Sequence, residues 1–142
     1  WIGGSAENYY NVGVQAAMRQ FSQFPNGRKL YNEYLTEDAI NQYLSDNPFD
    51  STNALKQINT QYWITCFCDE YETFSNWRRS GYPELVYPNL YLNPIPGVNH
   101  NLSRRFTYPD TESQINTANY EAAVSNLSKG NTFESRVWWD AE

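Results

Sequence analysis

The stretch from residue 52 to residue 80 limits the fold of this chain most, because apolar side chains recur in it at helical spacing. They form two stripes, one of Leu55, Ile58, Tyr62 and Cys66 and another of Trp63, Phe67, Phe74 and Trp77. Gly81 suits a left-handed helix cap, and Pro83 cannot continue a helix. We therefore predict one helix over about 52–80, and its wide apolar arc is typical of a helix at the centre of a fold.

Caps and periodicity predict three further helices. Their approximate bounds are 5–24, 36–46 and 117–129. Ser5 and Thr36 are typical N-cap residues, and Gly130 suits the end of the last helix. Gly13 and Ala16 leave one face of the first helix thin, which permits close approach of a neighbour. The sequence thus predicts a mainly α fold with little or no β-structure.

The segment 81–116 is predicted to be a long, proline-rich loop. Its prolines are Pro83, Pro88, Pro94, Pro96 and Pro109. Proline removes a backbone donor and clashes with the preceding turn, so this spacing excludes a long helix. A loop of this length in a compact domain usually carries a function or is firmly anchored.

Composition excludes some functions and leaves others open. The net charge is -6, whereas affinity for nucleic acid rests on clustered Lys and Arg. The same charge disfavours binding to anionic lipid, and no apolar run approaches the roughly 20 residues that span a bilayer. Aromatic residues make up 17% of the chain, which suits either a tightly packed core, the favoured interpretation, or a surface that stacks on rings.

Residues with catalytic or metal-binding chemistry are few. His100 is the only histidine, so a catalytic triad or a His-based metal site would depend on it alone. Cys66 and Cys68 lack the spacing of a redox or zinc motif, and we interpret them as small buried residues. Asp69 and Glu72 share a predicted helix face and are the only candidate carboxylate pair of a glycosidase. We predict no catalytic residue, no metal and no cofactor.

Several ordered motifs identify a family. Three stretches of the sequence are Trp77-Arg78-Arg79-Ser80-Gly81-Tyr82-Pro83, Arg104-Arg105-Phe106-Thr107-Tyr108-Pro109 with Glu112 and Asn116, and Val137-Trp138-Trp139-Asp140. They resemble three blocks of SusD/RagB-like outer-membrane lipoproteins and occur in the same order. Upstream, Tyr9-Tyr10 with Gly13-Val14, and Gln61-Tyr62-Trp63-Ile64, look like helices of the same family. Ser103 and Ala17 depart from the family pattern, where Pro and Ser are common. The resemblance spans nearly all of residues 1–142.

The resemblance implies that residues 1–142 are the C-terminal part of a longer, helical SusD-like protein. Such proteins are tethered by an N-terminal lipid to the bacterial outer membrane, at the cell surface. They bind a glycan or another nutrient and present it to a SusC-like TonB-dependent transporter, without catalysing a reaction. Two alternatives stay open: a helical glycan-processing enzyme that uses Asp69 and Glu72, and a protein-interaction module without direct ligand contact.

If the chain has the SusD-like fold, we expect most residues of the three motif blocks to serve packing and ion pairing. They are Trp77, Arg78, Arg79, Tyr82, Arg104, Arg105, Tyr108, Trp138 and Trp139. Buried arginines need carboxylate partners, and Glu84, Glu112 and Asp140 are available. The predicted ligand-binding residues lie instead in the loop and are Tyr87, Tyr91, Asn93 and His100. The tyrosines could stack on sugar rings, or they could only attach the loop to the body or to the transporter.

Overall fold

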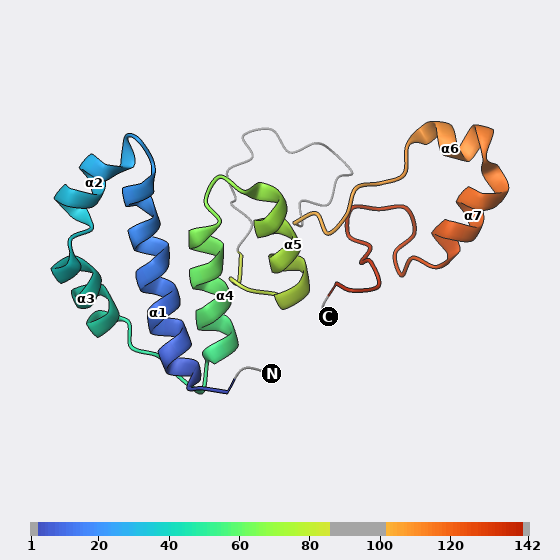
Figure 1. The fold of residues 1–142 in the computed structure, drawn as a ribbon. Coiled ribbons are helices and arrows are strands. Elements are labelled where there is room, and N and C mark those ends of the chain that lie inside the picture. Colours follow the sequence, from blue (N-terminus) through green and yellow to red (C-terminus); the bar gives the residue numbers. More distant parts are fainter. Residues whose placement is uncertain (1–2, 86–101, 141–142) are drawn as a thin grey trace, which may run out of the picture. The chain divides into compact units, whose positions relative to one another are not determined.

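The computed structural model describes residues 3–85 and 102–140, and all regular structure in these two ranges is helical (Figure 1). The elements are α1 (Ala6–Arg19), η1 (Gln20–Gln23), α2 (Gly27–Tyr34), α3 (Glu37–Asp46), α4 (Ala54–Thr65), α5 (Glu70–Ser80), α6 (Asp110–Ile115) and α7 (Thr117–Ser125). The predicted mainly α fold is confirmed, with no strand among the described residues. None of the described helices is both long and apolar enough to cross a lipid bilayer.

The chain divides into two compact units, Trp1–Thr73 and Phe74–Glu142. In the first unit α1 contacts both α3 and α4, and its core consists of Tyr10, Val14 and Ile40. The ring of Tyr10 lies 5.5 Å from that of Phe49, measured between centroids. The predicted caps are present here, because the Ser5 hydroxyl accepts from Asn8 N–H and the Thr36 hydroxyl accepts from Ala39 N–H.

Helix α2 was not predicted, because Asn26-Gly27 after the helix predicted over 5–24 is a typical turn pair. The turn is present, with Gly27 N–H donating to Phe24 O at 3.0 Å, but a helix begins directly at Gly27. A Cβ atom at Gly27 would lie 2.1 Å from the backbone oxygen of Phe21. Glycine is therefore needed here for close backbone approach as well as for the turn.

The single helix predicted over 52–80 is wrong, because the structure has two helices there. Helix α4 ends at Thr65 and α5 begins at Glu70, and Cys68 between them has a φ of 72°. Asp69 accepts Glu72 N–H with its carboxylate at 3.2 Å and Thr73 N–H with its backbone oxygen at 3.0 Å. Asp69 thus caps a new helix, and the apolar spacing continues through the break without revealing it.

The break also changes the environment of the two cysteines. Both are free thiols, Cys66 half-buried and Cys68 exposed, so the interpretation of Cys68 as a buried residue is wrong. Helix α4 in turn has no buried residue, although its apolar arc predicted a central position. Its large apolar side chains are between 38% and 71% exposed.

The second unit contains the end of α5, the helix pair α6 and α7, and irregular segments around them. Helix α6 lies inside the predicted loop 81–116, where Pro109 directly precedes it as N-cap residue and Asp110 and Glu112 occupy its first turn. Proline is compatible with a helix start, so its presence did not exclude this short helix. Helix α7 ends at Ser125, four residues before the predicted 129, and Gly130 adopts a φ of 64°.

Candidate functional site

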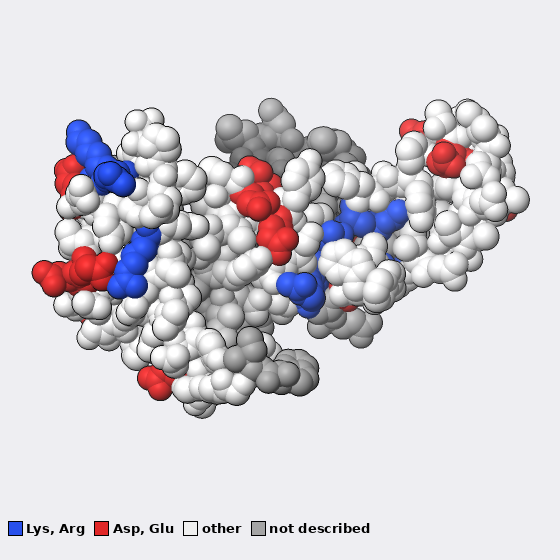
Figure 2. All heavy atoms as spheres, viewed as in Figure 1, with Lys and Arg blue, Asp and Glu red and all other residues white. Residues whose placement is uncertain are grey.

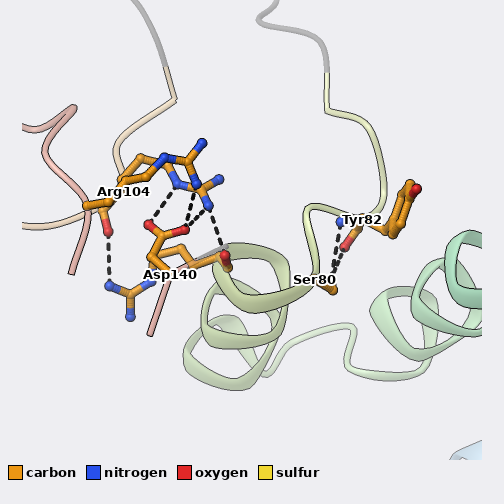
Figure 3. Close-up of polar contacts among 6 residues, drawn as sticks. Ser80, Tyr82, Arg104 and Asp140 are labelled. Carbon is orange, nitrogen blue, oxygen red and sulfur yellow. Dashed lines mark hydrogen bonds and ion pairs between the residues drawn. The ribbon is translucent and has the colours of Figure 1, made fainter. Parts of the chain in front are cut away.

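A buried carboxylate organises the recognised motifs of the second unit. The side chain of Asp140 is 0% exposed and receives hydrogen bonds from two arginines (Figure 3). Arg104 binds both carboxylate oxygens, with its Nε 2.9 Å from Oδ2. Arg136 Nη1 lies 3.0 Å from Oδ1. Asp140 is thus a carboxylate partner of the recognised arginines, as predicted, and the side chain of Arg104 beside it is 11% exposed.

Arg104 and Arg78 also bind each other's backbone. Arg78 Nη1 donates to Arg104 O at 2.9 Å, and Arg104 Nη2 donates to Arg78 O at 2.8 Å (Figure 3). The last carbonyls of a helix have no partner within the helix, and Arg104 supplies one for the last turn of α5. At the last residue of that helix, the Ser80 hydroxyl accepts from Tyr82 N–H at 3.1 Å. The turn that precedes Pro83 is thereby ordered.

Aromatic rings cover the same guanidinium groups. The Cζ atom of Arg104 lies 4.2 Å from the ring centroid of Trp77. Arg78 contacts two rings, with its Cζ 4.1 Å from the Phe74 centroid and 4.4 Å from the Trp139 centroid. Burial lowers the pKa of Arg78 from its usual value, and the nearby charge of Asp140 opposes this change. These contacts combine cation–π attraction with exclusion of water.

Arg105 is buried by different partners. It is 7% exposed, and its Nη1 donates to the side-chain oxygen of Asn131 at 3.1 Å. Its Cζ lies 4.7 Å from the ring centroid of Tyr108. The predicted carboxylate partner Glu112 instead accepts from Asn116 at 3.2 Å. Among residues 3–85 and 102–140, an amide and an aromatic ring contact Arg105 where a carboxylate was expected.

Trp138 differs from the packing role predicted for it. It is 94% exposed, whereas Trp77 is 8% exposed. Trp139 carries the packing of the C-terminal motif, because its ring lies against Arg78. Adjacent residues in a turn point in different directions, so two neighbouring tryptophans do not have to share one environment.

The residues predicted to bind ligand, namely Tyr87, Tyr91, Asn93 and His100, lie outside the described residues. They stay a prediction. Hydrogen bonds described above lie close to both ends of segment 86–101. Ser80 and Tyr82 order the chain before it, and Arg104 anchors the chain after it through Asp140.

The two carboxylates of the enzyme alternative have structural partners. Asp69 caps α5, and the Tyr62 hydroxyl donates to Glu72 at 2.7 Å. This hydrogen bond raises the pKa of Tyr62. Both acids are exposed, and their contacts explain why these residue types occur at this break. Within the described ranges, no group of three or more His, Cys, Asp and Glu side chains could hold a metal ion.

A groove on the first unit was not predicted as a site. It has a volume of about 610 Å³ and is lined by Ala6, Tyr9, Tyr10, Gly13, Val14, Ala16, Ala17, Gln20, Ile58, Gln61, Tyr62 and Thr65. All of them except Gln20, the first residue of η1, belong to α1 and α4, and none of them is charged. The small residues at Gly13 and Ala16 were the sequence signal that a neighbour approaches α1. On the face drawn in Figure 2, charged side chains occur in small groups separated by uncharged surface.

A polar hollow of about 420 Å³ adjoins this groove, with Tyr10 and Gln61 contributing to both. Its other lining residues are Asn47, Asp50, Asn53, Lys56, Gln57 and Thr60. Hydrogen bonds from Asn53 and Thr52 lower the pKa of Asp50 to about 2. Most of these polar groups order the connection between α3 and α4, as in the bond from Asp50 N–H to Gln57 Oε1 at 2.8 Å.

Comparisons with known proteins agree with the motifs. The family model described as "Susd and RagB outer membrane lipoprotein" matches residues 1–140. A solved structure of a chitin-binding protein shares 33% sequence identity and a TM-score of 0.76, covering 100% of this chain and 29% of that one. A Bacteroidetes AC2a SusD-like structure shares 27% identity and a TM-score of 0.81, covering 100% and 27%. No match was found among curated proteins.

These findings show a helical protein of the kind that the three motif blocks indicate. The chain belongs to the SusD-like family. It spans less than a third of the length of the two solved relatives.

Proposed function

We propose that residues 1–142 are the C-terminal part of a SusD-like protein that binds a glycan and presents it to a SusC-like TonB-dependent transporter. The observation that carries this proposal is the 33% identity, over the whole chain, to a chitin-binding protein. The family description as an outer membrane lipoprotein supports a position at the bacterial cell surface, held by an N-terminal lipid. The protein acts by binding and transfer, without catalysis.

The glycan contact of this segment lies in the loop that contains Tyr87 and Tyr91. Tyrosine rings can stack on the C–H faces of a pyranose, and Asn93 and His100 offer neutral hydrogen-bonding groups for hydroxyls. Prolines in the loop restrict its free conformations and reduce the ordering cost of binding. The Arg104–Asp140 network supports this role, because it anchors the chain shortly after segment 86–101, which contains these residues.

The test measures glycan affinity of the full-length protein by calorimetry, with chitin oligosaccharides as the first ligands. We expect Tyr87→Ala or Tyr91→Ala to weaken binding by about tenfold or more, the effect of losing one stacking contact of about 1.4 kcal/mol. Tyr71→Ala is the control, because Tyr71 is 87% exposed on α5. Circular dichroism verifies that each variant is folded.

Two results would contradict parts of this proposal. Unchanged affinity in both loop variants would place the glycan site outside residues 1–142 and favour the alternative in which this segment has no direct ligand contact. Absence of binding to chitin, starch, xylan and mannan oligosaccharides by the unmodified protein would contradict glycan binding itself.

A further inference from the structure

We propose that the groove between α1 and α4 is the docking site for a helix of the same polypeptide that lies outside residues 1–142. The proposal rests on one premise of the proposed function, namely that these residues are part of a longer protein. It concerns how this segment is held in that protein and is independent of glycan binding.

The first argument is the apolar surface that α4 leaves uncovered. Ile58 and Tyr62 line the groove and are 40% and 38% exposed, and Tyr9 on α1 is 50% exposed. Removing such apolar surface from water contributes about 25 cal/mol per Å². Partly exposed apolar side chains gathered along one groove favour an interface over scattered exposure, and the helical periodicity of 52–80 had already predicted a buried position for them.

The second argument is shape. A Cβ atom added at Gly13 would meet no atom within 4 Å, so the side of α1 that carries this glycine is open. Ala16 and Ala17 lie one turn further along the same groove. Small residues at this spacing allow the backbone of a second helix to approach closely, and glycine within a helix otherwise only destabilises it. Close packing of an incoming helix would explain why a glycine occurs at position 13 within α1.

The third argument is chemical character. No charged residue lines the groove, whereas surfaces of transient complexes are more polar than those of permanent ones. The hydroxyl of Tyr10, at the border between the groove and the polar hollow, is buried without a hydrogen-bond partner. Gln57 and Gln61 lie near it, but their amide nitrogens donate to Pro48 O and to the Tyr43 hydroxyl. A polar group on an incoming segment would satisfy this hydroxyl.

The fourth argument identifies the occupant. Two solved relatives match this chain over its whole length, yet it covers only 29% and 27% of their chains. Most of a protein of that kind therefore lies outside the matched region and is available to cover the groove. A permanent, uncharged interface fits a segment of the same polypeptide better than an exchanging partner.

Cysteine labelling of the full-length protein tests whether the groove is covered. Ala16 lines the groove and Ala39 on α3 does not, and both are exposed among residues 1–142. We expect maleimide to modify the Ala16→Cys variant at least about tenfold more slowly than the Ala39→Cys variant, because reaction then needs local opening. Peptide mass spectrometry separates the introduced thiol from Cys66 and Cys68. Equal rates in the two variants would overturn the proposal.

Photo-cross-linking tests which chain covers the groove. Benzoylphenylalanine in place of Gln20, a lining residue with a long side chain, should form an intramolecular cross-link to residues outside 1–142. Cross-links to a second copy, to another protein or within residues 1–142 would overturn the proposal. Glycan affinity is measured on the same samples. A covered groove without glycan binding contradicts only the proposed function, and glycan binding with an open groove contradicts only the docking.

Discussion

At the scale of single residues, the two tryptophans Trp77 and Trp138 show how burial separates side chains of one type. Both belong to recognised motifs, but Trp77 is 8% exposed beneath Arg104 and Trp138 is 94% exposed. The sequence motif assigned both to packing. Only the contacts around each ring distinguish the residue that stabilises the unit from the one that faces solvent.

We predict that Trp77→Ala lowers the free energy of unfolding by at least about 3 kcal/mol, the range for a buried large aromatic side chain. The matched control Trp138→Ala should change it by less than about 0.5 kcal/mol, as for an exposed position. Urea unfolding monitored by circular dichroism measures both. Similar losses in the two variants would contradict the difference in burial.

Glu37 gives a prediction for acidic pH. Arg19 Nη2 lies 2.6 Å from Glu37 Oε2, and the Tyr31 hydroxyl donates to Oε1 at 2.9 Å. The pKa of Glu37 is lowered from 4.5 to about 2. The largest cause is the hydrogen bond from Arg19, and the second is the hydrogen bond from Tyr31. A lowered pKa in the folded state stabilises the protein above the unfolded-state pKa, and this contribution disappears as the pH falls toward 2.

We expect NMR titration to find the Glu37 carboxyl still ionised at pH 3, and the Arg19→Gln variant to shift its pKa back toward the ordinary value. In Glu37→Gln, the decrease in stability between about pH 4.5 and 2 should be smaller than in the unmodified protein. A Glu37 pKa near 4.5 in the unmodified protein would show that this ion pair does not form in solution.

At the scale of secondary structure, side-chain caps were predictable and the helix break was not. Ser5 and Thr36 cap α1 and α3 through the backbone groups expected from the sequence. Asp69 performs the same function for α5, but it lies inside a continuous apolar pattern and was interpreted as a possible catalytic acid. A cap is recognisable from local sequence only where the pattern on one side of it stops.

The strain at the break can be tested at Cys68, whose φ of 72° is unfavourable for a residue with a Cβ atom. We predict that Cys68→Gly stabilises the protein by about 0.5 kcal/mol. Glycine removes the energetic penalty of a left-handed conformation, but it loses more conformational entropy on folding, which offsets part of the gain. Cys68→Ala retains the Cβ atom and should give no such gain. Urea midpoints of the two variants decide the question, and an equal effect would indicate that strain is not the cause.

At the scale of the whole chain, contacts between distant residues hold the second unit together. Arg104 and Asp140 are 36 residues apart, and their contact connects the later part of the predicted loop 81–116 to the C-terminal motif. In the same unit, Arg104 N–H donates to Phe133 O at 2.8 Å. The unit therefore depends on a buried polar network together with its aromatic residues.

Asp140→Ala should lower the free energy of unfolding by about 3 kcal/mol, because it leaves the mostly buried side chain of Arg104 without its carboxylate. Asp140→Asn keeps the shape and some hydrogen bonds, and its effect should be smaller. Hydrogen exchange at the Arg104 amide reports the local loss of order, and we expect it to accelerate most in the alanine variant. Unchanged exchange in both variants would contradict the anchoring role of Asp140.

The sequence by itself determined the helical class, the caps at Ser5 and Thr36, and family membership through three ordered motif blocks. These features are local, since a cap, a helical period or a motif is contained in a few neighbouring residues. Only the tertiary structure decided which arginines pair with Asp140, that Trp138 is exposed, and that the apolar side chains of α4 stay partly exposed. Burial and pairing depend on which distant segments meet, and in Arg104 and Asp140 those segments are 36 residues apart.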